Sequence, residues 1–450
     1  MSGKLRQYLA SSISMMSVMV AGAAYSWFEP LTLRLTEAPT SFTLEQVSWM
    51  VSIVEVGSIL APMIAGDLAN RIGRKLVILS VGPLCLLGWF LVIFDMSFLS
   101  LNVVRFIHGF ATGIVFTVTP IYTAEIAEPK LRGTLSGFFQ IAWHMGNLYS
   151  FITGPYLSYN SFVYACLPLP IFFTVSFLFF PEAPYYLLMK GRTQEAKESL
   201  LWFRNTDNVD AEFAGMQAAV KEEMNTKSSW KTLFFDKSER KAFIIVQIVS
   251  ASKFMTGMPV IVNYAAETFA RGESFLPAAE MSIILGILLT TIAVLSAFLS
   301  DWIGRKPLLL ISCFGCFVAH GLTGAYYYLH EGTVLNATPY VWLMYLGIVS
   351  YCFFIDIGLG PLLQTLQAEM FGASTRGLAA GITELLGAGF SFLVLKTYSP
   401  ANEAFGVYFN FWFYSAVGLI GGLLLTWLMI ETAGRTIGRM EEAAPKDVQC

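Results

Sequence analysis

Twelve apolar runs, each long enough to cross a lipid bilayer as a helix, constrain this chain more than any other feature. A helical crossing needs about 20 apolar residues, and a helix satisfies its backbone hydrogen bonds within one segment. Of the 450 residues, 55% are hydrophobic and 13% charged, whereas a soluble domain carries about 25% charge. We therefore expect an all-α membrane protein with twelve transmembrane helices. The runs cover residues 10–30, 47–66, 76–94, 99–124, 133–157, 161–181, 242–266, 280–300, 307–329, 340–370, 377–398 and 406–430.

Lysine and arginine lie almost entirely on one side of this expected membrane. Twelve spans place both termini on the same side, and 23 of the 28 Lys and Arg lie in the tails and loops of that side. The opposite loops hold Arg34 and Arg271, while Arg105, Lys253 and Lys396 lie within or at the ends of spans. Because positive residues accumulate in cytoplasmic loops, both termini are expected in the cytoplasm.

The first apolar run also has features of a secretory signal peptide. Lys4 and Arg6 precede it, and Ala21-Gly22-Ala23 is similar to a cleavage site. Cleavage would leave the later spans in place. The internal repeat described below requires six spans in the first half, so we expect this run to be a retained helix.

One long polar segment, residues 182–241, divides the spans six and six. Within it, residues 193–204 and 210–224 have helical spacing. The prediction is an N-terminal six-helix bundle at 1–181, a cytoplasmic helical linker domain at 182–241, a C-terminal six-helix bundle at 242–430 and a cytoplasmic tail at 431–450.

Two motifs occur once in each half and in the same order. NRIGRK (70–75) closes the second span and DWIGRK (301–306) closes the eighth, while AEIAEPKLRG (124–133) closes the fourth and AEMFGASTRG (368–377) closes the tenth. Gly73 and Gly304 permit a tight turn between helices. The chain therefore reads as a duplicated six-helix bundle, an arrangement that transporters use with the substrate site between the repeats.

The repeated motifs place acidic and basic residues at the same membrane edge in both halves. Partly buried charges at helix ends need partners, so we expect a clamp that holds the halves together on the cytoplasmic side and biases a two-state equilibrium. The alternative is that these charges only fix the membrane topology. The first half supplies Asp67, Glu125 and Arg132, and the second supplies Asp301, Glu369 and Arg376.

These motifs resemble the sugar porter family of the major facilitator superfamily. The likeness rests on GDLANRIGRK, RFIHG, PIYTAEIAEPKLRG, DWIGRK, GPLLQTLQAEMF, STRG and ETAGRT, and it covers nearly the whole chain. The short tails and SWMVSIVEVGSILAP look most like the insect facilitated trehalose transporters. The resemblance implies the major facilitator fold and alternating access, and we expect the protein in the plasma membrane. It also implies an inner gate formed by Asp67, Arg71, Arg74, Glu125, Arg132, Asp301, Arg305, Glu369, Arg376, Glu431 and Arg435.

At most of the positions where that family contacts sugar, this chain carries a different residue. Gln140 matches the family's glutamine in the fifth span. Elsewhere Lys253 and Phe254 stand for two Gln, Pro259 for Asn, Leu363 for Pro, Gln364 for Trp, and Gly387 and Ala388 for Asn-Trp. Since an unpaired substrate hydroxyl costs about 1–3 kcal/mol, other polar groups must replace these to retain sugar affinity.

We expect such a replacement pocket around two ionisable residues deep in predicted spans, Lys253 and Glu384, because intramembrane charges mark functional sites. The hypothesis is that the two pair when the site is empty; the alternative is that either faces a water-filled vestibule. Glu55, also within a span, is as consistent with a helix–helix hydrogen bond as with a substrate role. The candidate substrate-binding residues are Gln140, Lys253, Phe254, Asn263, Gln364 and Glu384.

The first span bears on whether transport is driven by protons. Proton-driven sugar porters resemble one another in carrying an Asp in this span. Here the only carboxylate is Glu29, near the outer end. The prediction is facilitated transport of a small sugar, trehalose or a hexose. The alternatives are a non-transporting sugar sensor, or proton-coupled transport of another polyol or organic solute with Glu55 or Glu384 as the proton carrier.

No constellation of residues indicates an enzyme, a cofactor or a metal site, and His108 and His144 are lone histidines in apolar helices. The expected partners are a small sugar and the lipid bilayer, with no nucleic acid and no obligate protein. Asn336-Ala337-Thr338 is a glycosylation sequon on the predicted outer side.

Overall fold

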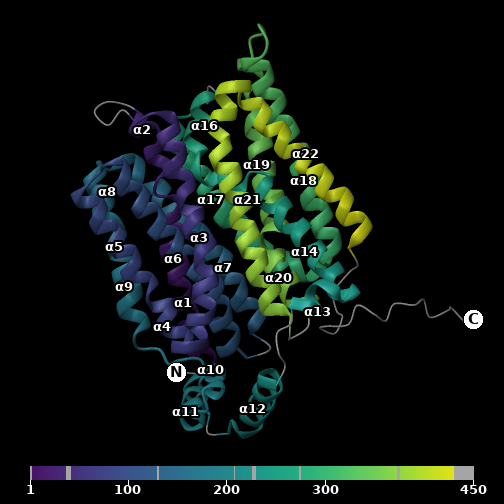
Figure 1. Cartoon of the computed structure of the whole chain (residues 1–450). Coiled ribbons are helices and arrows are strands. Elements are labelled where there is room, and N and C mark those ends of the chain that lie inside the picture. Colours follow the sequence, from purple (N-terminus) through teal and green to yellow (C-terminus); the bar gives the residue numbers. More distant parts are fainter. Residues whose placement is uncertain are drawn as a thin grey trace, which may run out of the picture.

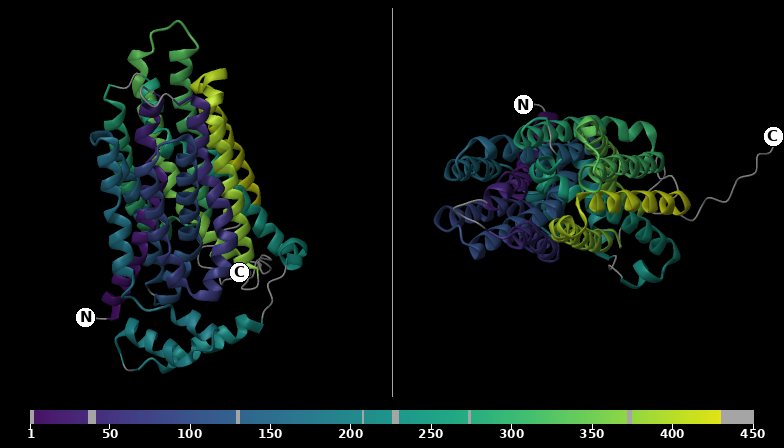
Figure 2. Two further views of the ribbon diagram at one scale, coloured as in Figure 1. Left: turned by 60° about the vertical axis from the view of Figure 1, so that its left-hand side comes forward. Right: turned by 90° about the horizontal axis from the view of Figure 1, so that it is seen from above.

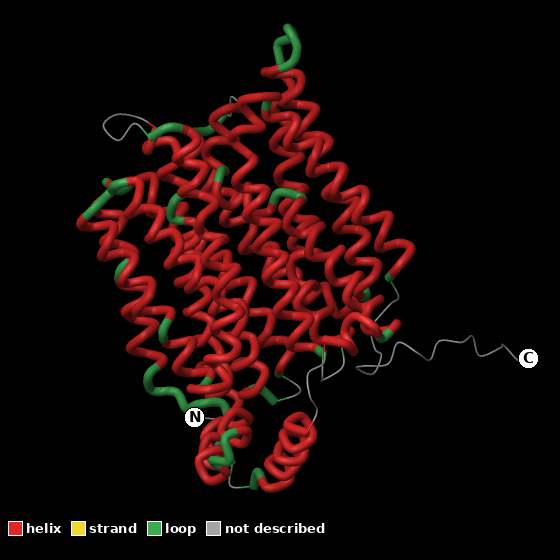
Figure 3. The backbone as a smooth tube through the Cα atoms, in the orientation of Figure 1, coloured by secondary structure: helices red, strands yellow, loops and turns green. Residues whose placement is uncertain are grey.

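The computed structural model describes residues 3–36, 42–128, 131–206, 208–225, 230–272, 275–371 and 375–429, and within these ranges it is helical without strands (Figure 3). Two sets of helices flank the long polar segment, and we call them the N-terminal helices (α1–α9) and the C-terminal helices (α14–α22). The N-terminal helices are α1 (Gly3–Ser26), α2 (Thr32–Thr36), α3 (Leu44–Ile72), α4 (Arg74–Leu79), α5 (Val81–Phe94), α6 (Phe98–Ile126), α7 (Arg132–Tyr156), α8 (Tyr159–Cys166) and α9 (Pro168–Phe177).

The C-terminal helices include two crossings that are broken within the bundle. The seventh is divided into α14 (Lys237–Met255), α15 (Met258–Asn263) and α16 (Ala265–Arg271), and the tenth into α19 (Val341–Ile357) and α20 (Leu359–Met370). The others are continuous: α17 (Ala278–Ile303), α18 (Arg305–Glu331), α21 (Arg376–Phe405) and α22 (Val407–Leu428). Broken helices expose backbone carbonyls to the interior of a membrane protein.

Eleven segments of the described chain are long and apolar enough to cross a membrane. The expected fifth crossing, α7, is 25 residues long and packs against α1 and α17, but it is less apolar because it contains Gln140, His144 and Asn147. Polar residues on a helix that packs inside a bundle face other helices instead of lipid. Together these twelve crossings form a multi-pass membrane protein with the expected all-α architecture.

The long helices lie roughly along one common axis. Purple and blue helices occupy one side of the molecule, and green and yellow helices occupy the other (Figures 1 and 2). One end of the bundle carries the start of α1 and the helices of the polar segment; we call it the terminal face, and the opposite end the far face. The polar segment forms α10 (Pro184–Met189), α11 (Thr193–Arg204), α12 (Asp210–Asn225) and α13 (Trp230–Phe235).

The repeated basic turns have the same backbone conformation in both sets. Gly73 between α3 and α4 has φ 113° and ψ 155°, and Gly304 between α17 and α18 has φ 91° and ψ 158°. This positive-φ region favours glycine because a Cβ atom would clash there. The predicted turns are confirmed, and the sequence repeat is also a repeat of structure.

Helix α11 is anchored to the N-terminal helices by hydrogen bonds across the terminal face. Arg6 donates to the Trp202 carbonyl at 2.9 Å, and Arg204 donates to the Ile126 carbonyl at 2.9 Å. Arg204 also pairs with Glu212 of α12 at 2.7 Å. These contacts fix α11 and α12 beneath the N-terminal helices.

Candidate functional site

A cavity of about 80 Å³ lies between the N- and C-terminal helices, about half-way along their length. Small-molecule sites usually enclose roughly 300–1,000 Å³, so the two sets must separate before a solute as large as a sugar enters. The lining residues are Tyr25, Glu55, Ser58, Pro62, Thr112, Gly113, Phe116 and Trp143 from the N-terminal helices, and Phe254, Glu384, Ala388 and Ser391 from the C-terminal helices.

Glu55 bridges the two sets at this cavity. Its Oε1 accepts hydrogen bonds from the Tyr25 hydroxyl at 2.6 Å and from the Ser391 hydroxyl at 2.6 Å. The side chain is 5% exposed. A helix–helix hydrogen bond, one of the two roles expected for Glu55, is therefore present, and it joins α3 to α21.

Arg105 of α6 is fully buried, and its guanidinium donates hydrogen bonds to three backbone carbonyls. It donates to the carbonyls of Met50 and Val51 at 2.9 Å each, and to that of Tyr25 at 2.5 Å. A longer bond of 3.3 Å reaches the side chain of Asn263 across the set boundary. Asn263 therefore lies against Arg105 and outside the cavity lining.

Gln140 belongs to a second polar bridge, between α7 and α19. Its amide lies 2.9 Å from His144 Nε2 and 3.5 Å from Asp356 Oδ1, and His144 Nε2 lies 3.1 Å from Asp356 Oδ2. The His144 and Asp356 side chains are fully buried. Buried polar groups that meet across a boundary hold it strongly when paired and are costly when parted.

Lys253 and Glu384 lie near one another, but each bonds elsewhere in this structure. The Lys253 amine donates to the Gly360 carbonyl at 3.0 Å, at the break between α19 and α20, and lies 5.4 Å from the centre of the Phe254 ring. Glu384 accepts a weak bond of 3.4 Å from Gln367. Glu384 and Gln140 occupy equivalent repeat positions, eight residues after Arg376 and Arg132.

Two departures from the sugar porter pattern fit together in space. A Cβ atom added to Gly387 would lie 2.6 Å from the Phe254 ring, so any side chain there requires the ring to move. An aromatic ring thus fills the space that the missing side chain at 387 leaves. Gln364 lies on α20, one turn beyond Gly360, and does not line the cavity.

The charged residues predicted to form an inner gate pair within each set near the terminal face. Arg74 lies 3.1 Å from Glu125, and Arg305 lies 3.2 Å from Glu369, so corresponding residues of the two repeats form the same pair. Arg71 and Asp67 form an exposed pair at 2.8 Å, and Arg376 donates to the Phe371 carbonyl at 3.2 Å. The side chains of Arg132 and Asp301, and residues Glu431 and Arg435, lie outside the described part, so the clamp across the halves stays a prediction.

Glu182 and Tyr186 complete the Arg74 site and were not singled out from the sequence. Glu182 accepts from the Lys75 backbone N–H at 3.0 Å, capping α4, and the Tyr186 ring lies 5.0 Å from the Arg74 guanidinium. The available sequence signal is Pro181-Glu182-Ala183-Pro184, a carboxylate between two helix-breaking prolines.

Contacts at the far face hold the two sets together. Glu29 accepts from the Ala266 backbone N–H at 2.8 Å and from Ser282 at 2.7 Å, and the Ser48 hydroxyl donates to the Lys396 carbonyl at 3.1 Å. Each contact joins the N-terminal part of the chain to a C-terminal helix, with Glu29 in a short 3-10 helix, η1 (Glu29–Leu31), between α1 and α2. The far ends of the two sets are therefore closed upon each other in this structure.

Known proteins agree with this architecture. A family model for "Sugar (and other) transporter" matches residues 9–444. The facilitated trehalose transporter Tret1 of Bombyx mori is 26% identical over 438 residues, covering 97% of this chain and 86% of that protein. Tret1 of Apis mellifera ligustica is also 26% identical over 438 residues, covering 96% and 86%.

Solved structures show the same fold at low identity. The proton:xylose symporter XylE bound to 6-bromo-6-deoxy-D-glucose has a TM-score of 0.78 at 19% identity, covering 96% of this chain and 97% of that one. The partially occluded inward open form of XylE from E. coli has a TM-score of 0.79 at 19% identity, covering 96% and 99%. With the family model spanning nearly all its residues, the chain belongs to the sugar (and other) transporter family.

Proposed function

We propose that this protein carries a small sugar, trehalose or a hexose, down its gradient across the plasma membrane by alternating access. The observation that carries the proposal is a small cavity between two repeated sets of helices, where the Glu55–Ser391 hydrogen bond joins the sets at the cavity lining and the His144–Asp356 pair forms a second bridge between them. The trehalose transporters among the relatives support sugar as the cargo class.

The N- and C-terminal helices would act as the two moving bundles, within the predicted domains 1–181 and 242–430. Each bundle keeps its own gate pair, Arg74–Glu125 or Arg305–Glu369, while the contacts between bundles are hydrogen bonds that rearrange as the bundles rock. The distribution of Lys and Arg supports a cytoplasmic terminal face. Asn336 is exposed in the loop after α18, where a glycan has room.

Sugar recognition is assigned to Phe254 and Glu384, which line the cavity, and to four residues that lie outside its lining in this closed structure: Gln140, Lys253, Asn263 and Gln364. In the closed state most of their polar atoms bond to protein. Opening the cavity would break the contact of the Gln140 amide with Asp356, which crosses between the sets, and would bring sugar hydroxyls within reach of the Lys253 amine and the Glu384 carboxylate, whose bonds lie within the C-terminal helices. Uptake that survives Lys253→Ala together with Glu384→Ala would remove these two residues from the site.

Uptake of labelled trehalose, glucose, fructose and a polyol into proteoliposomes tests the function, with and without an inward proton gradient. The proposal expects saturable uptake of one sugar that does not respond to the gradient. Accumulation that requires the gradient would contradict facilitation, and no uptake by folded protein would contradict sugar transport.

A further inference from the structure

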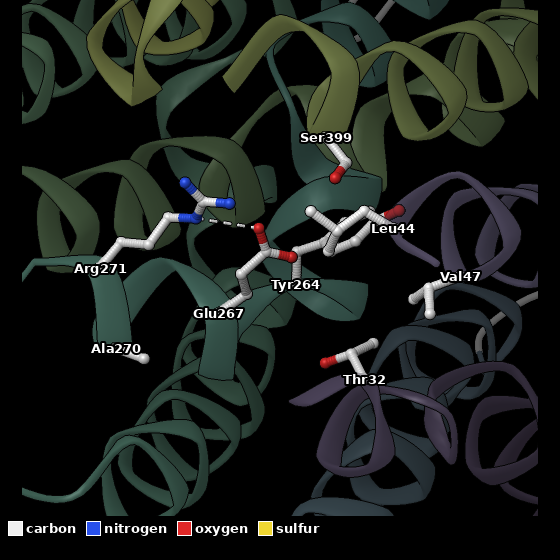
Figure 4. Close-up of a pocket in the computed structure, with 8 residues that line it drawn as sticks. All are labelled: Thr32, Leu44, Val47, Tyr264, Glu267, Ala270, Arg271 and Ser399. Atoms are coloured by element: carbon white, nitrogen blue, oxygen red, sulfur yellow. Dashed lines mark hydrogen bonds and ion pairs between the residues drawn. The ribbon is translucent and has the colours of Figure 1, made fainter. Parts of the chain in front are cut away.

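A second pocket, of about 250 Å³, lies at the far face between the two sets of helices (Figure 4). Thr32, Leu44 and Val47 form its N-terminal wall, and Tyr264, Glu267 and Arg271 form most of its C-terminal wall. It is three times as large as the central cavity, and its volume approaches the range of small-molecule sites. We call it the far-face vestibule.

The chemistry of the vestibule suits a polyhydroxylated ligand. Arg271 Nε donates to Glu267 Oε1 at 3.1 Å, so a guanidinium and a carboxylate stand side by side on α16. Adjacent sugar hydroxyls can donate to a carboxylate and accept from a guanidinium at once. The apolar side chains of Leu44 and Val47 face this pair across the pocket and offer contact for the C–H face of a sugar ring (Figure 4).

Tyr264 adds an aromatic ring to the vestibule lining. Its side chain is 1% exposed, and its hydroxyl lies beside that of Ser48. A tyrosine ring presents an apolar body, which suits the C–H face of a sugar ring.

The vestibule exists only while the far face is closed, because its two walls belong to different sets. The walls are held together by Glu29, which bonds to Ala266 and Ser282 beside the pocket. A ligand that binds one conformation and not the other shifts the equilibrium toward the one it binds. Solute in the vestibule would therefore oppose opening of the far face.

We propose that the far-face vestibule is a second sugar site, and that sugar bound there slows the opening of the far face and so inhibits uptake at high concentration. This inference rests on the proposed sugar transport. It gives the same cargo two opposing effects, since sugar drives the cycle from the central cavity and restrains it from the vestibule.

The test is initial uptake from the far-face side into cells or oriented vesicles, measured from well below KM to a hundred times KM. Wild-type uptake is expected to rise and then fall at least twofold. Glu267→Gln removes the carboxylate and is expected to move the falling limb at least tenfold higher in concentration. Glu280→Gln, which removes an exposed far-face carboxylate outside the vestibule, is expected to keep the wild-type curve.

A wild-type curve that saturates without falling would overturn the proposal, as would a falling limb unchanged in Glu267→Gln. If low sugar concentrations give no uptake at all, the result rejects the proposed sugar transport and leaves sugar binding in the vestibule to be tested separately. Equilibrium binding of labelled sugar to the purified protein then decides the vestibule alone: sugar binding that Glu267→Gln weakens tenfold or more supports it, and binding unchanged by the substitution, or no binding, rejects it.

Discussion

Glu55 of α3 and Ser391 of α21 are joined by a hydrogen bond of 2.6 Å that crosses between the N- and C-terminal helices at the central cavity. The bond must break whenever the two sets separate at that depth. Ser391→Ala removes it and leaves Tyr25 as the recorded hydrogen-bond donor to the same oxygen. A hydrogen bond contributes about 0.5–1.5 kcal/mol net, so we expect the open far face to become about two- to tenfold more populated.

Labelling of a cysteine at buried Val47, in a background without the native cysteines, measures this population. Ser391→Ala should label faster than the parent by about the same factor. Ser150→Ala is the matched control, because the Ser150 hydroxyl bonds to the Ala23 carbonyl within the N-terminal helices. Equal labelling rates in both variants would show that the Glu55–Ser391 bond does not restrain opening.

Phe254 and Gly387 predict a non-additive pair of substitutions. Gly387→Asn alone forces a side chain into the Phe254 ring, and overpacking typically costs about 1–3 kcal/mol. Phe254→Gln removes the ring and makes room, so the double variant should recover most of the thermal stability that Gly387→Asn loses. Melting temperatures of the two single variants and the double variant in detergent measure the coupling. Additive losses would mean that the contact is not what excludes a side chain at 387.

Burial predicts a graded response from three arginines at the terminal face. Arg74 and Glu125 are 6% and 11% exposed, Arg305 and Glu369 are 16% and 26% exposed, and Arg71 and Asp67 are 72% and 60% exposed. Breaking a buried pair costs about 3–5 kcal/mol, whereas an exposed pair contributes about 0–1 kcal/mol.

Alanine should therefore lower the melting temperature most at Arg74, less at Arg305 and least at Arg71. Unfolding in detergent, followed by tryptophan fluorescence, ranks the three variants. A loss at Arg71 as large as the loss at Arg74 would contradict the assignment of stability to the buried pairs.

Asn336 gives a test of orientation. If the far face is external, the protein made in eukaryotic cells should show a mobility shift that a glycosidase removes, and Asn336→Gln should abolish that shift. Glycosylation that persists in Asn336→Gln would have to come from another position and would count against this assignment.

The crossings and the repeat could be predicted from the sequence because both depend on local signals. Apolar length predicted the spans, and Gly73 and Gly304 predicted turns that only a positive φ provides. The site was harder, because its contacts join residues that are far apart in the chain. Nothing local in His144 or Asp356 indicates that α7 meets α19, and the fit of Phe254 to Gly387 depends on packing between α14 and α21. For Lys253, the sequence indicated an important charge but not its partner, since the Gly360 carbonyl is exposed by a helix break.

Sugar counterflow in proteoliposomes tests the central claim most directly. Vesicles loaded with unlabelled sugar are diluted into a trace of the same labelled sugar, with no proton gradient or membrane potential. A facilitator that alternates between two faces predicts transient accumulation of label above the external concentration, followed by decay. Simple equilibration without an overshoot, from protein shown to be folded, would contradict alternating-access transport of that sugar.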